Sequence, residues 1–339
     1  MRPLIVAHRG ASLLAPENTL AAFRAAQDAG ADGVELDVQM TQDGQLIIAH
    51  DFITDRILNV HYDVFDTTFE ALRKLDFGFW NGVDFSSERM PTLEESLDVC
   101  RNMKTIHVEL KPYFDRDKDF VPRVLDTILD MGCENNVVIT SFQQDLLRQV
   151  KEQMPQVKTN MLFMTFKSLY FPPPALWEEL GLTNGEDTSD PVLEKLAEVN
   201  SFQQVLDLVE NPDELDGENG KIYQTLRDRV LALLSNYPGK NMLEILEDMF
   251  RQSDLPRYVS QFDFPVDYVG TSYYEHFRDP DLVKKFQAMG IGSAPWPMFN
   301  ETELELRSIL KMEPEMLLTN KPDLLHRMMD EQDAANAKD

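Results

Sequence analysis

Cysteine is scarce in this chain of 339 residues, because only Cys100 and Cys133 are present. Both follow apolar runs of helical periodicity, and their spacing fits neither a zinc motif nor a disulfide framework. We therefore expect both to be packing residues in a protein of a reducing compartment.

Long hydrophobic runs and basic residues are also lacking. No apolar run approaches the roughly 18 residues of a membrane-spanning helix, and the first strand follows Met1 and Arg2 directly, which leaves no room for a signal peptide. The 32 basic residues are outnumbered by 59 acidic ones, which gives a formal net charge of -27. Such a surface repels nucleic acid and anionic lipid headgroups. These absences predict a cytoplasmic protein with no nucleic-acid partner and no stable membrane association.

What is present is a regular alternation of strand-like and helix-like segments. The strands that we expect are 4–8, 33–38, 46–50, 105–110, 136–141, 158–163, 267–272, 291–294 and 315–319. In "VQMTQDGQLIIAH", a turn at residues 42–44 joins two alternating runs, so one of these strands is a hairpin arm. The hydrophobic content of 43% is enough for a full core. The remaining strands and their helices predict an α/β fold, the (β/α)8 or TIM barrel.

Three segments depart from this alternation. Residues 51–91 carry aromatic and aspartate-rich loop text and predict a small insertion after the second strand region. Residues 165–262 turn helical and acidic, with breaks such as "PPP" and "NPDELDGENG", and predict a large helical insertion after strand 5 of the barrel. The polar residues 329–339 predict a frayed tail. The barrel itself would comprise residues 1–164 and 263–328.

The role of the large insertion stays open. It begins with "LYFPPPALWEEL" after the fifth barrel strand, so it would lie at the barrel mouth. It could be a lid over a bulky substrate, an arm for homo-oligomer formation, a docking module for a protein partner, or a solvated decoration. Its acidic faces disfavour an amphipathic role at lipid surfaces.

Chemically active side chains stand at the ends of several predicted strands. They are His8 and Arg9 on the first strand, Glu35 and Asp37 on the second, His50 on the hairpin arm, and Glu109 and Lys111 on the following strand. Residues two apart on a strand share a face, so each pair with that spacing points to one side. Because the carboxyl ends of barrel strands converge on the mouth that holds active sites, we expect these side chains to meet.

Three carboxylates brought together at that mouth repel one another unless a cation lies between them. Oxygen ligands favour a hard divalent cation, Mg2+ or Ca2+ with Mn2+ as an alternative, over zinc. We therefore predict one divalent cation between Glu35, Asp37 and Glu109.

His8 and His50 have no partner at metal-motif spacing, so acid and base roles explain them better than metal ligation. Arg9 and Lys111 supply the local positive charge that an anionic phosphate needs on an acidic protein. Taken alone, each of these signals also has a purely structural interpretation. Their coincidence at strand ends indicates cleavage of a phosphodiester.

The same segments resemble the glycerophosphodiester phosphodiesterase family of the PLC-like phosphodiesterase superfamily. The resemblance rests on "HRGASLLAPENT", "GADGVELDVQMTQDGQLIIAHD", "TDR", "ERMPTLEESL", "VELKP", "VVITSF" and "LLTNKPD". It implies a (β/α)8 barrel with 51–91 as the family's insertion beside the site. It further implies metal ligands at Glu35, Asp37 and Glu109, an acid/base pair at His8 and His50, and phosphate contacts at Arg9 and Lys111.

By this resemblance, the activity would be metal-dependent hydrolysis of glycerophosphodiesters, such as glycerophosphocholine or glycerophosphoethanolamine, to glycerol 3-phosphate and an alcohol. One histidine would deprotonate the neighbouring glycerol hydroxyl for attack on phosphorus, the other would protonate the leaving alcohol, and water would open the cyclic phosphate. Two alternatives stay open: lysophospholipase D-like hydrolysis of a lysophospholipid, and a barrel that binds a phosphodiester or protein without turnover.

The segment "SAPWPMFN" departs from the W-T-V-N strand that is usual in this family, because Pro297 interrupts it and one residue is extra. Similarly, the usual T-D-R-P is "TNKP" in this chain. Trp296 could bind substrate as a wall of the glycerol or leaving-group pocket, or it could pack at the barrel mouth. Substrate choice is therefore less well specified than the chemistry.

Overall fold

The computed structural model describes residues 2–58, 60–113, 119–166, 203–204, 241–298 and 300–336. Within them, one sheet has the strand order β8–β7–β6–β5–β4–β2–β1–β9, and β3 pairs with β2 alone. The strands are β1 (Leu4–Ala7), β2 (Gly33–Met40), β3 (Leu46–Ile48), β4 (Thr105–Leu110), β5 (Val137–Ser141), β6 (Lys158–Phe163), β7 (Tyr268–Thr271), β8 (Gly292–Ser293) and β9 (Met316–Thr319).

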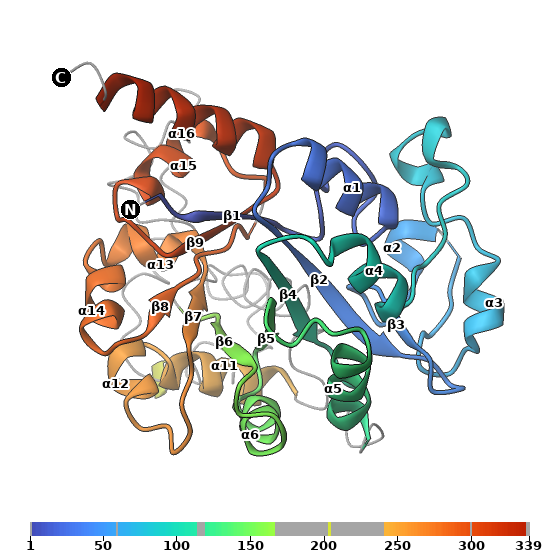
Figure 1. Cartoon of the computed structure of the whole chain (residues 1–339). Coiled ribbons are helices and arrows are strands. Elements are labelled where there is room, and N and C mark those ends of the chain that lie inside the picture. The colour runs from blue at the N-terminus through green and yellow to red at the C-terminus, as the bar shows by residue number, and fades with distance from the viewer. Residues whose placement is uncertain are drawn as a thin grey trace, which may run out of the picture.

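The sheet curls into a nearly closed barrel (Figure 1). Neighbouring strands along the sheet order are parallel, whereas β3 runs antiparallel to β2 as the predicted hairpin arm. The two ends of the sheet meet where Leu318 N donates a hydrogen bond to Pro295 O at 2.9 Å. The predicted (β/α)8 barrel is therefore confirmed.

Helices surround the barrel (Figure 1). They are α1 (Leu20–Asp28), α4 (Leu93–Cys100), α5 (Phe120–Asp130), α6 (Gln144–Gln153), α11 (Met242–Arg251), α12 (Leu255–Val259), α13 (Tyr273–Arg278), α14 (Leu282–Ala288), α15 (Glu303–Leu310) and α16 (Pro322–Asn336). Side-chain caps begin several of them: the Thr19 side chain accepts from Ala22 N on α1, and Thr92 forms a capping box on α4.

Alternation along each strand separates the core from the site. On β2, Val34, Leu36 and Val38 point outward into the main hydrophobic core beneath the helices. The intervening Glu35 and Asp37 therefore point into the barrel. Both sets are buried, so β2 is covered on both faces although Glu35, Asp37 and Gln39 are polar.

The small insertion contains α2 (Asp55–Leu58), α3 (Phe69–Arg73) and two 3-10 turns, η1 (Phe79–Asn81) and η2 (Val83–Phe85). Its own buried cluster includes Val64, Leu72 and Phe77 together with Ile47 of β3. The hairpin arm thereby attaches the insertion to the barrel beside the end of β2.

Most of the predicted helical insertion at 165–262 lies outside the described residues. Its described end forms α11 and α12, which pack on the barrel. Ile245, Leu246 and Met249 of α11 share a buried cluster with Met164 and Trp296, and Leu255 of α12 joins the main core.

The chain end also differs from the expectation of a frayed tail, because α16 continues to Asn336. Met329 is buried, and the Arg2 guanidinium pairs with Asp330 and Asp333 at 2.8 and 2.9 Å. The polar residues from 329 to 336, which we expected to be frayed, are therefore helical and contact Arg2 near the start of the chain.

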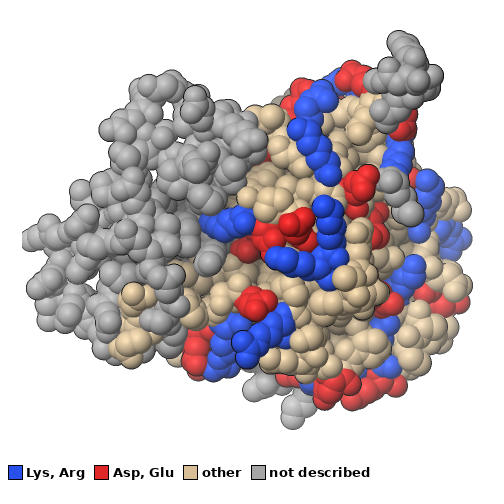
Figure 2. All heavy atoms as spheres, turned by 90° about the vertical axis from the view of Figure 1, so that its left-hand side faces the viewer, with Lys and Arg blue, Asp and Glu red and all other residues tan. Residues whose placement is uncertain are grey.

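The flank that carries α13 to α16 faces the viewer in Figure 2, where acidic and basic side chains lie next to one another. Arg307, for example, pairs with Glu303 one turn earlier on α15. No helix in the described part of the chain combines the length and apolar character needed to span a membrane.

Candidate active site

Three carboxylates meet inside the barrel mouth. Glu35 and Asp37 of β2 and Glu109 of β4 each offer an oxygen within 4.8 Å of the others. Parallel pairing places Asp37 directly beside Glu109, and all three residues are buried. The E-x-D and E-x-K spacings therefore place these side chains where the sequence predicted.

The turn after β1 fixes the position of Glu35. Arg9 has φ 57° and Gly10 has φ 78°, both in the left-handed region. This conformation lets Arg9 N donate a hydrogen bond to Glu35 Oε2 at 2.9 Å. A Cβ on Gly10 would lie 2.7 Å from Ala22 Cβ, so glycine is also needed for the approach of α1.

Asp37 is held by an amide and by a buried cation. Asn18, itself at φ 56°, donates from Nδ2 to Asp37 Oδ2 at 2.7 Å. Lys111 Nζ lies 3.4 Å from Asp37 Oδ1 and 2.7 Å from Glu109 Oε1. Burial raises the pKa of Asp37, but the charges of Lys111 and Arg9 and the Asn18 hydrogen bond act the other way and outweigh it, so the pKa is lowered.

Glu35 and Glu109, in contrast, resist ionisation in the absence of a further cation. Burial, together with the negative charges of Asp37 and Glu109, raises the pKa of Glu35 well above its usual range. Burial raises the pKa of Glu109 to about 7 although Lys111 opposes the change. Two acceptor oxygens, Glu35 Oε1 and Asp37 Oδ1, are buried without a hydrogen-bond donor among the described residues. This donor set fits a hard divalent cation, and the buried acidic triad could hold one.

The two histidines flank the triad with one ring nitrogen committed in each. His8 Nδ1 lies 2.9 Å from Asn320 Oδ1, and its Nε2 lies 3.9 Å from Glu35 Oε2. His50 Nδ1 lies 2.6 Å from Asp51 Oδ1. In both rings Nε2 is the nitrogen left for proton transfer.

Burial and nearby cations make both imidazoles weak bases. Burial, with Arg9 second, lowers the pKa of His8 to about 4. Burial also lowers the pKa of His50 well below its usual value, and the charges of Arg9 and Lys111 act in the same direction. Both rings are therefore neutral at pH 7 before an anion enters the site.

Arg9 reaches across the mouth to acidic partners. Its Nη1 lies 3.0 Å from Glu17 Oε1, and its Nε lies 3.7 Å from Asp37 Oδ2. Trp296 lies apart from this network, since it packs in the apolar cluster of α11 with its ring centroid 6.0 Å from that of Phe142. Its Nε1 is buried without a hydrogen bond to any described residue.

Several residues around the site were not singled out from the sequence. They are Glu17, Asn18, Gln39, Asp51, Arg56, Glu301 and Asn320. Most of them stand inside the quoted motifs: Glu17 and Asn18 belong to "APENT", Asp51 follows His50, and Arg56 ends "TDR". The signal was present, but their roles depend on contacts between distant segments.

Comparisons with known proteins agree with this geometry. Residues 8–211 match the model of the Glycerophosphoryl diester phosphodiesterase family. The chain is 39% identical over 164 residues to the glycerophosphodiester phosphodiesterase of Caldanaerobacter subterraneus subsp. tengcongensis. The aligned region covers 48% of this chain and 68% of that protein. It is 35% identical over 150 residues to glycerophosphodiester phosphodiesterase 1 of Homo sapiens, which covers 43% of this chain and 45% of that one.

Solved structures share the fold. A phosphodiesterase of Oleispira antarctica, in complex with the product sn-glycerol-3-phosphate, superimposes with a TM-score of 0.62 at 19% identity over 97% of both chains. The glycerophosphodiester phosphodiesterase of Thermotoga maritima gives a TM-score of 0.56 at 19% identity over 97% of this chain and 99% of that one. With the family match covering residues 8–211, the chain belongs to the glycerophosphoryl diester phosphodiesterase family, a family of phosphoric diester hydrolases.

Proposed function

We propose that this chain is a metal-dependent phosphodiesterase that hydrolyses glycerophosphodiesters, such as glycerophosphocholine or glycerophosphoethanolamine, to glycerol 3-phosphate and an alcohol. The observation that carries the proposal is the buried carboxylate triad with a histidine on either side and two cations in contact with it. The names of its relatives and the product in the Oleispira structure support the substrate class.

The proposed ligands of one divalent cation, Mg2+ or Ca2+ with Mn2+ as an alternative, are Glu35, Asp37 and Glu109. Such a cation, when bound, neutralises negative charge that develops on phosphoryl oxygens. Arg9 and Lys111 are proposed to contact the phosphate. Since both also lie within 4 Å of Asp37, they stabilise the ionised triad as well.

His8 and His50 are proposed to move the protons. One neutral ring accepts the proton of the glycerol hydroxyl through Nε2 while that hydroxyl attacks phosphorus. The other ring must be charged to protonate the leaving alcohol, and an anionic phosphate beside it favours the charged form. Water then opens the cyclic phosphate. Trp296 is proposed to wall the glycerol or leaving-group pocket from the apolar half of the mouth.

The test is release of glycerol 3-phosphate from a panel of glycerophosphodiesters by EDTA-treated protein to which Mg2+, Ca2+ or Mn2+ is returned. We expect turnover that depends on the added cation and is absent in His8→Ala. Inactivity with all three cations supplied would contradict the proposal and favour a barrel that binds a phosphodiester or protein without turnover.

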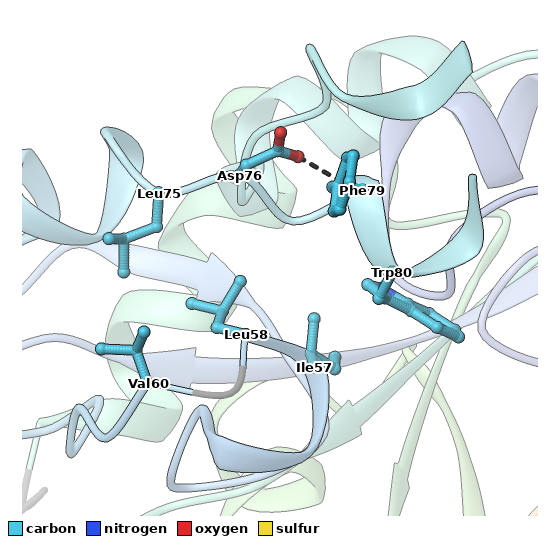
Figure 3. A pocket seen from close by; sticks show the side chains of 7 residues that line it. All are labelled: Ile57, Leu58, Val60, Leu75, Asp76, Phe79 and Trp80. Atoms are coloured by element: carbon cyan, nitrogen blue, oxygen red, sulfur yellow. Dashed lines mark hydrogen bonds between the residues drawn. The ribbon is translucent and has the colours of Figure 1, made fainter. Parts of the chain in front are cut away.

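A second candidate substrate is a lysophospholipid, and an apolar pocket of about 370 Å3 in the small insertion favours it (Figure 3). Its lining is Ile57, Leu58, Val60, Leu75, Asp76, Phe79 and Trp80. The Asp76 carboxylate accepts a hydrogen bond from Phe79 N, which leaves the pocket apolar in character. The wall contributed by α2 adjoins Arg56, which contacts Asp51 beside His50.

Chain length tests this second candidate. If the pocket binds the acyl chain, kcat/KM for monomeric lysophosphatidylcholines should rise by about fourfold per methylene until the pocket is filled. Trp80→Ala should flatten that dependence, whereas Val83→Ala, at an exposed position outside the pocket lining, should leave it unchanged. A flat dependence in the unsubstituted protein would contradict a lysophospholipid role.

We further propose that the acidic segment 165–262, most of which lies outside the described residues, contacts a second copy of the chain or a protein partner. Its described end at α12 belongs to the barrel, since Leu255 lies in the main core. The net charge of -27 disfavours nucleic acid and anionic membranes as partners. We also propose a cytoplasmic location. Size-exclusion chromatography with light scattering, on the full chain and on a variant in which this segment is shortened, tests the oligomer.

A further inference from the structure

A continuous line of hydrogen bonds runs from His50 into the small insertion. His50 Nδ1 and Asp51 Oδ1 are 2.6 Å apart. The other oxygen of the same carboxylate, Asp51 Oδ2, accepts a hydrogen bond from Arg56 Nε at 2.6 Å. Since Arg56 lies on α2, the first helix of the insertion contacts Asp51, and Asp51 in turn contacts the His50 imidazole.

Arg56 is itself fixed by a second carboxylate. Its Nη1 and Nη2 donate to the two oxygens of Glu17 at 3.0 and 2.7 Å. Glu17 Oε1 also accepts from Arg9 Nη1 at 3.0 Å. With two guanidinium groups against it, the pKa of Glu17 falls to about 2 despite burial, so Glu17 stays ionised at any working pH. The line therefore ends on the proposed phosphate-binding arginine.

The backbone of the same dipeptide is also held. Gln39, buried inside the barrel two residues after Asp37, directs Nε2 at the carbonyl oxygens of His50 and Asp51 at 3.2 and 2.9 Å. Side chain and backbone together leave the His50–Asp51 pair little freedom. Such double support is typical of a ring whose orientation matters to the chemistry.

The partner of His50 differs in kind from that of His8. A carboxylate paired with a guanidinium only accepts hydrogen bonds, so the hydrogen between His50 and Asp51 belongs to the imidazole Nδ1. The corresponding partner of His8 is the neutral amide of Asn320, whose Nδ2 donates to Glu301 Oε2 at 2.8 Å. The hydrogen bond of His50 is therefore assisted by the negative charge of Asp51, whereas the partner of His8 carries no charge.

We propose that Asp51 and Arg56 are positioning residues for His50, and that they fix its Nδ1–H tautomer so that Nε2 exchanges the proton with the substrate. This inference rests on the proposed function, because it assigns the orientation of a ring proposed to act there. It adds two residues of the small insertion to the machinery of the barrel.

Replacing the carboxylate by an amide gives the sharpest test. In Asp51→Asn, Arg56 can only donate, so the amide oxygen turns toward Arg56 and the NH2 group toward His50. The ring is then driven to the Nε2–H tautomer, which cannot accept a proton at Nε2. We expect kcat on glycerophosphocholine to fall by about 100-fold or more, with KM and the dissociation constant of Mg2+ within about threefold of the starting values.

A second substitution should restore activity. In Asp51→Asn/Arg56→Ala, the amide is free to turn its oxygen back to His50 Nδ1, so kcat should exceed that of Asp51→Asn alone. A role in folding stability alone predicts the opposite, because the double variant loses more contacts. The matched control is Asp55→Asn on the same helix, which removes the negative charge from the exposed contact of Asp55 with His61 (2.9 Å) and should leave kcat unchanged.

The tautomer can be read without turnover, in EDTA-treated protein at pH 7, from the nitrogen chemical shifts of 15N-labelled histidine, with His50→Ala identifying the signal. We expect Nδ1–H in the unsubstituted protein and Nε2–H in Asp51→Asn. An Nε2–H ring in the unsubstituted protein, or no gain in kcat from the double variant, would overturn the proposal. Failure to hydrolyse any glycerophosphodiester would instead reject the proposed function, because the ring measurement needs no activity.

Discussion

The two halves of the barrel mouth differ sharply in chemistry. The half built by β1, β2 and β4 carries the triad, both cations and His8, with His50 on the adjoining arm. The half built by β6 to β9 presents Leu162, Ala294, Trp296 and Leu318, over which α11 packs. The end of β9 and the residue after it contact His8 from the second half: His8 N donates to Thr319 O at 2.9 Å, and His8 Nδ1 lies 2.9 Å from Asn320 Oδ1.

This difference separates chemistry from shape. The charged groups proposed to act on phosphate are gathered on the neighbouring strands β1, β2 and β4. The opposite half supplies an apolar surface that excludes water and strengthens electrostatic interactions within the mouth. Substitutions in the first half should therefore change turnover, and those in the second should change stability or substrate binding.

The largest effect is expected within the polar half. His8→Ala and His50→Ala should each lower kcat by about 100- to 10,000-fold while retaining the divalent cation, because neither ring is a proposed ligand. Glu35→Ala should lose both turnover and cation affinity. Calorimetric titration with Mg2+, alongside release of glycerol 3-phosphate, separates the two classes. Equal loss of cation from the histidine variants would make the imidazoles ligands.

A large effect on stability, in contrast, is expected at Trp296. Its ring is buried against α11 and Phe142, so Trp296→Ala should lower the free energy of unfolding by about 3–5 kcal/mol as measured in urea. Trp296→Phe keeps most of the packing. If the phenylalanine variant has unchanged stability but a raised KM, Trp296 also binds substrate, and the division between the halves is less strict.

A pH effect should appear in cation binding. In the metal-free protein Glu109, with a pKa of about 7, takes up a proton as the pH falls below 7, and Glu35, whose pKa is raised well above its usual range, acts in the same direction. The cation must displace these protons, so its affinity should fall as pH drops below 7, by about tenfold per pH unit for each proton displaced. Calorimetry in buffers of different ionisation enthalpy counts these protons. Affinity independent of pH between 5.5 and 7.5 would contradict the raised pKa values.

The smallest effect is expected at the start of α15. Thr302 caps α15, where its Oγ1 accepts from Glu305 N at 3.2 Å. Thr302→Ala should lower the free energy of unfolding by about 1 kcal/mol and leave kcat and KM unchanged. Thermal melting and steady-state kinetics check the two parts, and a change in kcat would show that α15 influences the site.

The amino-acid sequence was sufficient to predict the barrel and the triad. Strands such as β2 and β4 are predicted from their alternation of apolar and polar residues, and the E-x-D and E-x-K spacings determine which side chains share a face. The hairpin arm followed from a short turn signal at Gly44. All of these features are local, which is why pattern alone recovers them.

Contacts between segments far apart in the sequence could not be predicted from local patterns. Asn320 joins His8 from a point 312 residues away, and Arg56 joins Glu17 across 39 residues. The last turns of α16 pair with Arg2, at the other end of the chain. No periodicity encodes such pairings, because they depend on how the barrel closes and on how the small insertion lies against it.

The most direct test of the central claim is release of glycerol 3-phosphate from glycerophosphocholine by EDTA-treated protein as Mg2+ is returned, measured beside Glu109→Gln. The account predicts no turnover without the cation, recovery on titration, and loss of both turnover and cation affinity in the variant. Turnover that survives EDTA, or a Glu109→Gln protein as active as the unsubstituted one, would contradict it.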